Sequence, residues 1–226
     1  MISLNNISKV YGSGGAKTTV LHDLTMEIKE GEFIAIMGPS GSGKSTLLNI
    51  LGTLDVPSSG TYTFLDTQIG ALSADQRALF RRYILGFIFQ GYNLLKKTSS
   101  LENVEVPLIY QGIDSKERKR MATQALKDVG LADRLFYDPG QLSGGQQQRV
   151  AIARAMVTHP KILIADEPTG NLDTKRGHEI MELIRTFNQQ GITVIMVTHE
   201  DDIATYASRT IYLRDGAIEK EVNHVS

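Results

Sequence analysis

The sequence predicts an α/β protein with a mostly parallel sheet core, an antiparallel β edge and a helical part inserted between strands. Three short apolar runs lead to this prediction: residues 33–37, 162–165 and 193–197. Each run is continuous and partly β-branched, as strands are in a parallel sheet that is covered on both faces. A turn and a helical pattern follow each run, which is the order of βα units.

Three other segments alternate apolar and polar residues: 2–5, 61–65 and 210–213. Alternation is typical of strands with one face in water, so we expect these segments at the edges of the sheet.

The middle of the chain has a helical pattern. Residues 73–76 have the spacing of a capping box, which predicts a helix through Arg82. A second helix is expected over Asp114–Val129, stopped by Gly130, with one apolar face made by Met121, Ala125, Leu126 and Val129. Its basic run, residues 116–120, fits either a contact patch or a solvated face. Residues 91–140 are therefore expected to form a helical insertion.

Composition limits the function classes. The chain has 226 residues, 41% of them hydrophobic, and a net charge of −1, so it lacks the basic excess of a nucleic-acid binder. It has no cysteine, which excludes disulfides and thiolate metal sites. We expect no signal peptide, and the apolar runs are too short to span a bilayer. We therefore expect a cytosolic protein whose membrane role, if any, needs a partner.

A phosphate-binding loop follows the first buried run. Its sequence, GPSGSGKST, fits G-x-x-x-x-G-K-[ST] at full length, between a predicted strand and a predicted helix. Backbone N–H groups and the helix N-terminus hold phosphates, Lys44 adds a positive charge, and the Ser45 hydroxyl ligates Mg²⁺. The nucleotide-binding residues expected here are Gly38, Ser40, Gly41, Ser42, Gly43, Lys44, Ser45 and Thr46.

Two carboxylates end the second buried run. Asp166 at the strand tip is placed to hold Mg²⁺. Adjacent strand residues point in opposite directions, so Glu167 is better suited to orient or deprotonate the attacking water, which favours hydrolysis. The alternative is an Asp-Glu cap before Pro168.

Three further residues are candidates for the same site. His199 follows the third buried run, and a neutral histidine there can hydrogen-bond a γ-phosphate or the water. Gln90 can touch Mg²⁺ or water, although this pattern alone does not decide between function and structure. Tyr11, before the glycine-rich residues 12–15, either stacks on adenine or fills the edge of a sheet.

A second anion site begins at Ser143. The sequence LSGGQQQRV leads into a predicted helix through Met156, and Ser143 with the free N–H groups of that helix can bind an anion. One nucleotide does not need two such sites on one chain. We therefore expect two chains to meet head to tail with ATP at both seams, so that each composite site takes one loop from each chain.

These motifs together resemble the nucleotide-binding subunit of an ABC transporter. The matching segments, in this order, are Gly38–Thr46, Gln90, Leu142–Gln146, Ile162–Glu167, Leu172-Asp173 and His199. The resemblance implies an ATPase that uses ATP and Mg²⁺, with Gln90 and Asp166 beside Ser45 at the metal and Glu167 as the catalytic base. It also implies that Tyr11 stacks on adenine, that His199 is the switch histidine, and that Asp173 crosses the dimer seam. Ser143, Gly145 and Gln146 would then meet the partner's nucleotide.

The sub-type resembles the MacB/LolD group, whose members power macrolide and peptide export or lipoprotein release. This likeness lies in four segments: 87–95, 102–108, 142–154 and 165–173. It implies a homodimer on the cytoplasmic face of the inner (plasma) membrane, bound to a permease with a large extracytoplasmic domain and, in some systems, a periplasmic adaptor. The permease would bind residues 91–95 and 102–110. The implied RecA-like core covers about 1–90 and 160–226, and the helical subdomain about 91–159.

Other functions share parts of this pattern. An ATP-gated signalling module that regulates an envelope or cell-wall partner, as in the neighbouring FtsE group, would have the same residues. Soluble ABC ATPases of translation or DNA repair usually carry two cassettes or a long coiled coil, and this chain has one cassette and no sustained heptads. In a P-loop kinase, Ser143–Gln146 and His199 would have no task.

Overall fold

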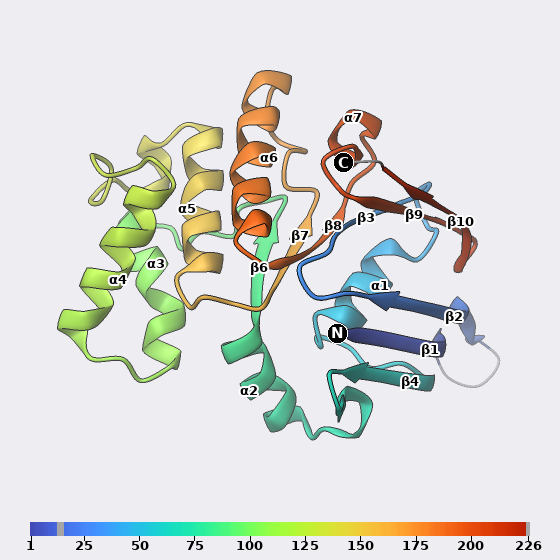
Figure 1. Ribbon diagram of the computed structural model, residues 1–226. Helices are drawn as coiled ribbons and strands as arrows, with labels where there is room; N and C mark the ends of the chain where they lie inside the picture. The colour runs from blue at the N-terminus through green and yellow to red at the C-terminus, as the bar shows by residue number, and fades with distance from the viewer. Residues whose placement is uncertain (13–15, 225–226) are drawn as a thin grey trace. The chain divides into compact units, whose positions relative to one another are not determined.

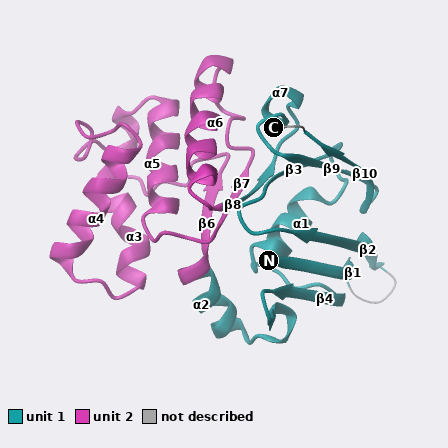
Figure 2. Cartoon of the chain, viewed as in Figure 1, with its two compact units in different colours: residues 1–81, 193–226 teal, residues 82–192 magenta. Residues whose placement is uncertain are grey.

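The computed structural model describes residues 1–12 and 16–224, so part of the glycine-rich stretch at 12–15 lies outside the described residues. The chain forms two compact units (Figure 2). Unit 1 comprises residues 1–81 and 193–226, and unit 2 comprises residues 82–192.

Unit 1 contains an antiparallel sheet with the strand order β2-β1-β4-β5. Figure 1 labels three of these strands, β2, β1 and β4. Its strands are β1 (Ile2–Tyr11), β2 (Thr18–Ile28), β4 (Ser59–Phe64) and β5 (Thr67–Gln68). Buried and exposed residues alternate along much of β1 and β2, because one face of the sheet packs on the core. β1 pairs with both β2 and β4, so the predicted edge segment at residues 2–5 lies in an interior strand.

Unit 1 also contains parallel strands. β3 (Phe33–Met37) pairs in parallel with β8 (Thr193–Val197) and with β9 (Arg209–Arg214), and β10 (Ala217–Asn223) is antiparallel to β9. All residues of β3 and β8 are buried, as their continuous apolar sequences predict. The expectation that residues 210–213 form an edge is wrong, because β10 covers that side of β9.

Short helices complete unit 1. α1 (Lys44–Leu51) contacts β2 and β8, and η2 (Ile69–Ala71) and α7 (Asp201–Ala204) are single turns. α2 (Ala74–Ile84) begins with the predicted capping box, in which the Ser73 N–H donates to Gln76 Oε1 at 2.8 Å and the Gln76 N–H donates to Ser73 Oγ at 3.2 Å.

Unit 2 is built around a long buried helix. β6 (Leu85–Phe89) and β7 (Ile162–Asp166) are parallel, and α5 (Gly144–Met156) packs on β6. α5 also contacts α6 (Thr174–Gln189), which lies beside it in Figure 1. Eight residues of α5 are buried, because other elements surround the helix.

The remaining helices of unit 2 are α3 (Ser100–Tyr110), α4 (Ser115–Asp128) and the short η3 (Pro139–Gln141). α3 and α4 contact each other and α5. The helix predicted over 114–129 corresponds to α4, with Asp114 as its N-cap. Its core contacts come from Ala122, Leu126 and Val129, while Met121 and Ala125 line a pocket.

Candidate functional site

The phosphate loop of unit 1 connects the end of β3 to the first turn of α1. All three of its glycines have backbone conformations that favour glycine, with φ of 148° at Gly38, 81° at Gly41 and 100° at Gly43. A Cβ at Gly38 would lie 2.2 Å from the Leu213 carbonyl oxygen, and one at Gly43 would lie 2.7 Å from Leu21 Cδ2. The loop therefore keeps its shape only with glycine at both positions.

The turn between β9 and β10 supports this loop through a backbone hydrogen bond. The Gly216 N–H donates to the Ser42 carbonyl at 3.2 Å, and the His22 N–H of β2 donates to the Gly216 carbonyl at 2.9 Å. The loop is thereby connected to β2 through Gly216.

Lys44 lies across the phosphate loop. Its Nζ donates to the carbonyl oxygens of Gly38 at 2.7 Å and Pro39 at 2.9 Å. The Ser42 hydroxyl is buried and, among the residues that the structure describes, has no hydrogen-bond partner. Ser40, Gly41 and Ser45 are exposed, and Ser45 lies in the first turn of α1. The Lys44 ammonium and the N-terminus of α1 together provide hydrogen-bond donors. This set of donors fits a nucleotide phosphate.

His199 follows β8, the neighbour of β3. The two strands are parallel, and Val197 pairs with Ile36. Because the carboxyl ends of parallel strands lie at the same edge, the chain leaves toward His199 and toward the phosphate loop from the same side of unit 1. His199 is exposed there.

Tyr11 ends β1 in the same unit and is 41% exposed. Its hydroxyl donates to Asp55 Oδ2 at 2.8 Å, and Asp55 follows the turn after α1. Burial of the hydroxyl, followed by its hydrogen bond to Asp55, raises the pKa of Tyr11.

Unit 2 brings Gln90 close to the two carboxylates. β6 and β7 pair so that Phe89 is level with Asp166, and Gln90 and Glu167 come next on the two strands. Asn171 Nδ2 donates to the Gln90 carbonyl at 2.7 Å, and a Cβ on Gly170 would lie 2.7 Å from Gln90 Nε2. The segment after Glu167 therefore packs against Gln90.

Glu167 has a left-handed backbone conformation, with a φ of 44°. The Gly170 N–H donates to its carbonyl at 3.1 Å and closes the turn after β7. For a residue other than glycine, this conformation costs about 1 kcal/mol. Strain of this kind is concentrated at functional sites.

The signature loop, defined as Leu142–Gln146, forms the N-terminus of α5. Ser143 Oγ accepts from the Gln146 N–H at 3.3 Å, and Gln146 Oε1 accepts from the Ser143 N–H at 2.9 Å. This reciprocal capping leaves the other N–H groups of the first turn for a ligand.

Asp173 lies near the signature loop because it caps the adjacent helix, α6. Its Oδ1 accepts from the Arg176 N–H at 3.0 Å, and its carboxylate pairs with the Arg176 guanidinium at 3.4 Å. A Cβ on Gly145 would lie 3.3 Å from Arg176 Cδ. Ser143, Gly145 and Gln146 line a hollow of about 90 Å³ together with Arg149, Arg176, Glu179 and Ile180.

Two side chains that were not predicted from the sequence position these loops. Gln148 is fully buried in α5, and its Nε2 donates at 2.7 Å to the carbonyl of Pro168, the residue after Glu167. Arg154, also in α5, donates to the carbonyls of Asn93 at 2.6 Å and Tyr92 at 2.9 Å, just after Gln90. For Gln148, the only signal in the sequence is the run of three consecutive glutamines, and this run does not reveal which of the three is buried.

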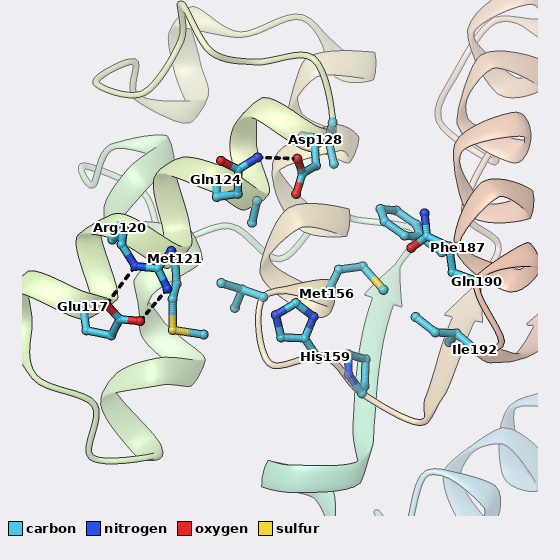
Figure 3. A pocket seen from close by; sticks show the side chains of 14 residues that line it. Glu117, Arg120, Met121, Gln124, Asp128, Met156, His159, Phe187, Gln190 and Ile192 are labelled. Atoms are coloured by element: carbon cyan, nitrogen blue, oxygen red, sulfur yellow. Dashed lines mark hydrogen bonds and ion pairs between the residues drawn. The ribbon is translucent and has the colours of Figure 1, made fainter.

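A larger pocket of about 430 Å³ lies elsewhere in unit 2, and none of the predicted site residues lines it. Figure 3 shows Met121, Met156 and Phe187 around it, with the ion pair of Glu117 and Arg120 on one wall. It is therefore not the predicted nucleotide site.

Within the described residues, none of the helices combines the length and the apolar sequence needed to cross a membrane.

A family model described as ABC transporter matches residues 21–170. An uncharacterised ABC transporter ATP-binding protein of Methanocaldococcus jannaschii is 52% identical over 99% of this chain and 100% of its own length. The ABC transporter ATP-binding protein YvrO of Bacillus subtilis, also uncharacterised, is 51% identical over 96% of this chain and 95% of its own. The macrolide export ATP-binding/permease protein MacB of Brucella melitensis is 50% identical over 96% of this chain, which spans only 34% of that relative.

Two solved structures of the cassette MJ0796 match with a TM-score of 0.90, and each match covers 99% of this chain and 98% of the other. One, 45% identical, is described as the dimeric structure of a bacterial ABC transporter cassette. The other, 44% identical, is described as a dimeric post-hydrolysis state bound to ADP and Pi. These likenesses confirm the predicted fold class.

Proposed function

Because the chain belongs to the ABC transporter ATP-binding family and is an ABC ATPase cassette, we propose that it forms an ATP-sandwiched homodimer that drives a MacB/LolD-like permease. The work of such a complex is export or lipoprotein release. The proposal rests on one observation: the chain has two separate candidate sites for phosphate. One is the loop spanned by Lys44, and the other is the helix N-terminus capped by Ser143.

Nucleotide binding is assigned to the phosphate loop. Residues 38–46 would hold the phosphates of ATP through backbone N–H groups and the Lys44 ammonium. Mg²⁺, when bound with ATP, neutralises phosphate charge, and its proposed ligands are Ser45, Gln90 and Asp166. The buried Ser42 hydroxyl and the Lys44 contacts support a phosphate ligand.

Hydrolysis is assigned to three side chains that lie at strand ends. Glu167 would orient and deprotonate the attacking water, Gln90 would contact the water and the metal, and His199 would hydrogen-bond the γ-phosphate. The strained backbone at Glu167 supports a functional role for this residue.

The dimer would complete each site from two chains. The nucleotide bound by the partner would be contacted by Ser143, Gly145 and Gln146. Asp173 would lie at the dimer interface. Support comes from the proximity of these residues at the N-termini of α5 and α6, and from the MJ0796 structures, both described as dimeric.

The binding site for the permease is assigned to the helical subdomain, residues 91–159. Residues 1–90 and 160–226 would form the RecA-like core. Exposed apolar side chains on the expected contact segments support this assignment: Leu95, Ile109 and Tyr110 are 50%, 53% and 66% exposed. The relative MacB is named as both ATP-binding protein and permease. We propose that this chain binds a permease with a large extracytoplasmic domain at the cytoplasmic face of the inner (plasma) membrane, and that some assemblies include a periplasmic adaptor.

The first test uses Glu167→Gln with Mg-ATP. We expect turnover to fall at least a hundredfold while ATP still binds, and we expect a dimer in gel filtration that reverts to monomer without nucleotide. Lys44→Ala is the matched variant, because it should weaken ATP binding and give no dimer. A Glu167→Gln protein that stays monomeric in saturating Mg-ATP would contradict the sandwich.

The partner is tested by pull-down of Glu167→Gln with Mg-ATP from detergent-solubilised membranes, followed by mass spectrometry. The expected result is a membrane protein with few helices and a large outer domain. Recovery of a regulator of cell-wall hydrolases without such a permease would instead favour the signalling function. Recovery of ribosomes and no membrane protein would contradict the proposal that this chain binds a membrane permease.

A further inference from the structure

Tyr11 is fixed by two neighbours in unit 1. Its hydroxyl donates to Asp55 Oδ2 at 2.8 Å. Lys9, two residues earlier on β1, places its Nζ 4.9 Å from the centroid of the Tyr11 ring. The ring is nonetheless 41% exposed, so it is oriented by these contacts and still open to a ligand.

Lys9 is one of the few buried charged residues of the chain, with 8% of its surface exposed. A buried ammonium is stable only when it is paired and hydrogen-bonded. Lys9 Nζ contacts Asp55 Oδ1 at 2.5 Å and donates to the Val56 carbonyl at 2.7 Å. The contact with the Tyr11 ring adds a cation–π interaction.

Asp55 is in turn connected to the helix that carries the phosphate-binding residues. Its N–H donates to the Asn49 carbonyl of α1 at 3.1 Å, and its Oδ1 accepts from the Val56 N–H at 2.7 Å. Through Asp55, the Tyr11 ring is therefore connected to the C-terminal turn of α1.

We propose that Lys9 and Asp55 are positioning residues that set the Tyr11 ring at a fixed place relative to the phosphate loop, so that a purine base stacks on it while its triphosphate lies at α1. This inference rests on the proposed function of Tyr11 as the base-binding aromatic. Fixing the ring before binding avoids the entropy cost of ordering it in the complex.

The network also contributes to the fold, so the test must separate base binding from folding. The readout is the dissociation constant of Mg-ATP beside that of Mg-tripolyphosphate, which has the phosphates but no base. Tyr11→Phe keeps the ring and removes the hydroxyl, Asp55→Asn removes the carboxylate, and Lys9→Met removes the ammonium. Each should weaken ATP binding about three- to tenfold, in the range of an aromatic pair, and leave tripolyphosphate binding unchanged.

The chain offers a matched control in unit 2. Arg134 has an ion pair with Asp133 at 2.6 Å and lies 4.8 Å from the Tyr137 ring centroid, which repeats the chemistry of Lys9. Arg134→Met should leave both dissociation constants unchanged. A loss of ATP affinity in this control would overturn the assignment to Lys9 and Asp55.

Three other outcomes are decisive. Equal weakening of ATP and tripolyphosphate would mean that the network supports only the phosphate loop, and the inference would fail. If Tyr11→Ala loses ATP affinity while Tyr11→Phe and Asp55→Asn do not, the base contact stands and the positioning role is wrong. If Tyr11→Ala binds ATP normally, the proposed role of Tyr11 itself is wrong. Should Asp55→Asn not fold, the surface variant Tyr11→Phe decides alone.

Discussion

Glu167 combines a proposed catalytic carboxylate with a left-handed backbone, and its φ of 44° is unfavourable for any residue except glycine and, less so, Asn or Asp. A turn follows the buried strand directly, and in it the Gly170 N–H donates to the Glu167 carbonyl. The chain keeps a strained residue where glycine would fold more easily, which is the pattern of a position under functional constraint.

The strain can be measured with two variants that both lack the side chain. We expect Glu167→Gly to be more stable than Glu167→Ala by about 1 kcal/mol, because only glycine adopts this φ without steric cost. Urea unfolding of both proteins without nucleotide gives the difference. Equal stabilities, or a more stable Ala variant, would show that the turn relaxes and that the backbone at Glu167 is not strained.

Asp55 makes stability depend on pH in a predictable direction. Burial raises the pKa of its carboxyl, but hydrogen bonds from Lys9, Tyr11 and the Val56 N–H, with the charge of Lys9, lower it overall below the ordinary value of 3.8. A lowered folded-state pKa means that the carboxylate stabilises the fold above about pH 4 and that this contribution disappears as the pH falls through the folded-state pKa.

We therefore expect the difference in unfolding free energy between the natural protein and Asp55→Asn to be constant from pH 7 to about pH 5 and to shrink below about pH 4. Urea titrations across this range measure it. A difference that grew on acidification would contradict the direction of the pKa shift.

At the scale of elements, α5 connects the loops of the proposed site. Its N-terminus is the signature loop, its interior residue Gln148 binds the turn after Glu167, and Arg154 near its end binds the segment after Gln90. Burial lowers the pKa of Arg154, and its two carbonyl partners compensate part of the cost of burying the charge. Tyr92 and Asn93, which supply those carbonyls, both have positive φ.

This arrangement predicts that Gln148 acts on catalysis as well as on stability. Gln148→Met keeps the length of the side chain and leaves the Pro168 carbonyl without its donor, so it should cost about 1–3 kcal/mol of stability. It should lower kcat several-fold with little change in KM, because the turn that carries Glu167 loses its support. Gln124→Met on the exposed surface of α4 is the control. A Gln148→Met protein with reduced stability and normal kcat would limit Gln148 to a structural role.

Some helices and strands could be predicted from the sequence, and others could not. The apolar runs of β3, β7 and β8 identified the buried strands, and the phosphate loop gave the start of α1. β2 escaped detection because its pattern is interrupted by His22-Asp23, and Asp23 has a left-handed backbone. α3 contains Val104, Val106 and Pro107, which disfavour a helix, yet it forms because Ser99 and Glu102 cap it and Val104 and Leu108 are buried.

The same limit applies to the site. Motif spacing predicted which residues stand at strand ends and helix starts, since those positions follow from local pattern. It could not predict that Lys9 pairs with Asp55, or that Gln148 reaches Pro168, because both contacts join segments that are remote in sequence and depend on how strands and helices pack.

At the scale of the whole chain, unit 2 is one continuous segment and unit 1 is formed by the segments on either side of it. The phosphate loop and His199 belong to unit 1, and the signature loop, Gln90 and the two carboxylates belong to unit 2. Monomer binding and dimer binding should therefore leave separate signatures along the sequence.

Hydrogen exchange of Glu167→Gln with Mg-ATP can distinguish nucleotide binding by one chain from nucleotide binding by the dimer. We expect protection of residues 41–46 at all protein concentrations, because binding to the phosphate loop needs one chain. Protection of residues 144–148 should appear only as the protein concentration rises, because the signature loop would bind the nucleotide of a second chain. Protection of both segments at high dilution would contradict the composite site.

The contact between Ser42 and Gly216 has a consequence for biosynthesis. The phosphate loop leaves the ribosome before unit 2, but the turn between β9 and β10 that supports it is translated after the whole of unit 2. Domains generally fold as their chain emerges, so unit 2 can become compact while the phosphate loop still lacks this support. Nascent chains would thus acquire firm nucleotide binding only after both unit 2 and the turn between β9 and β10 have emerged.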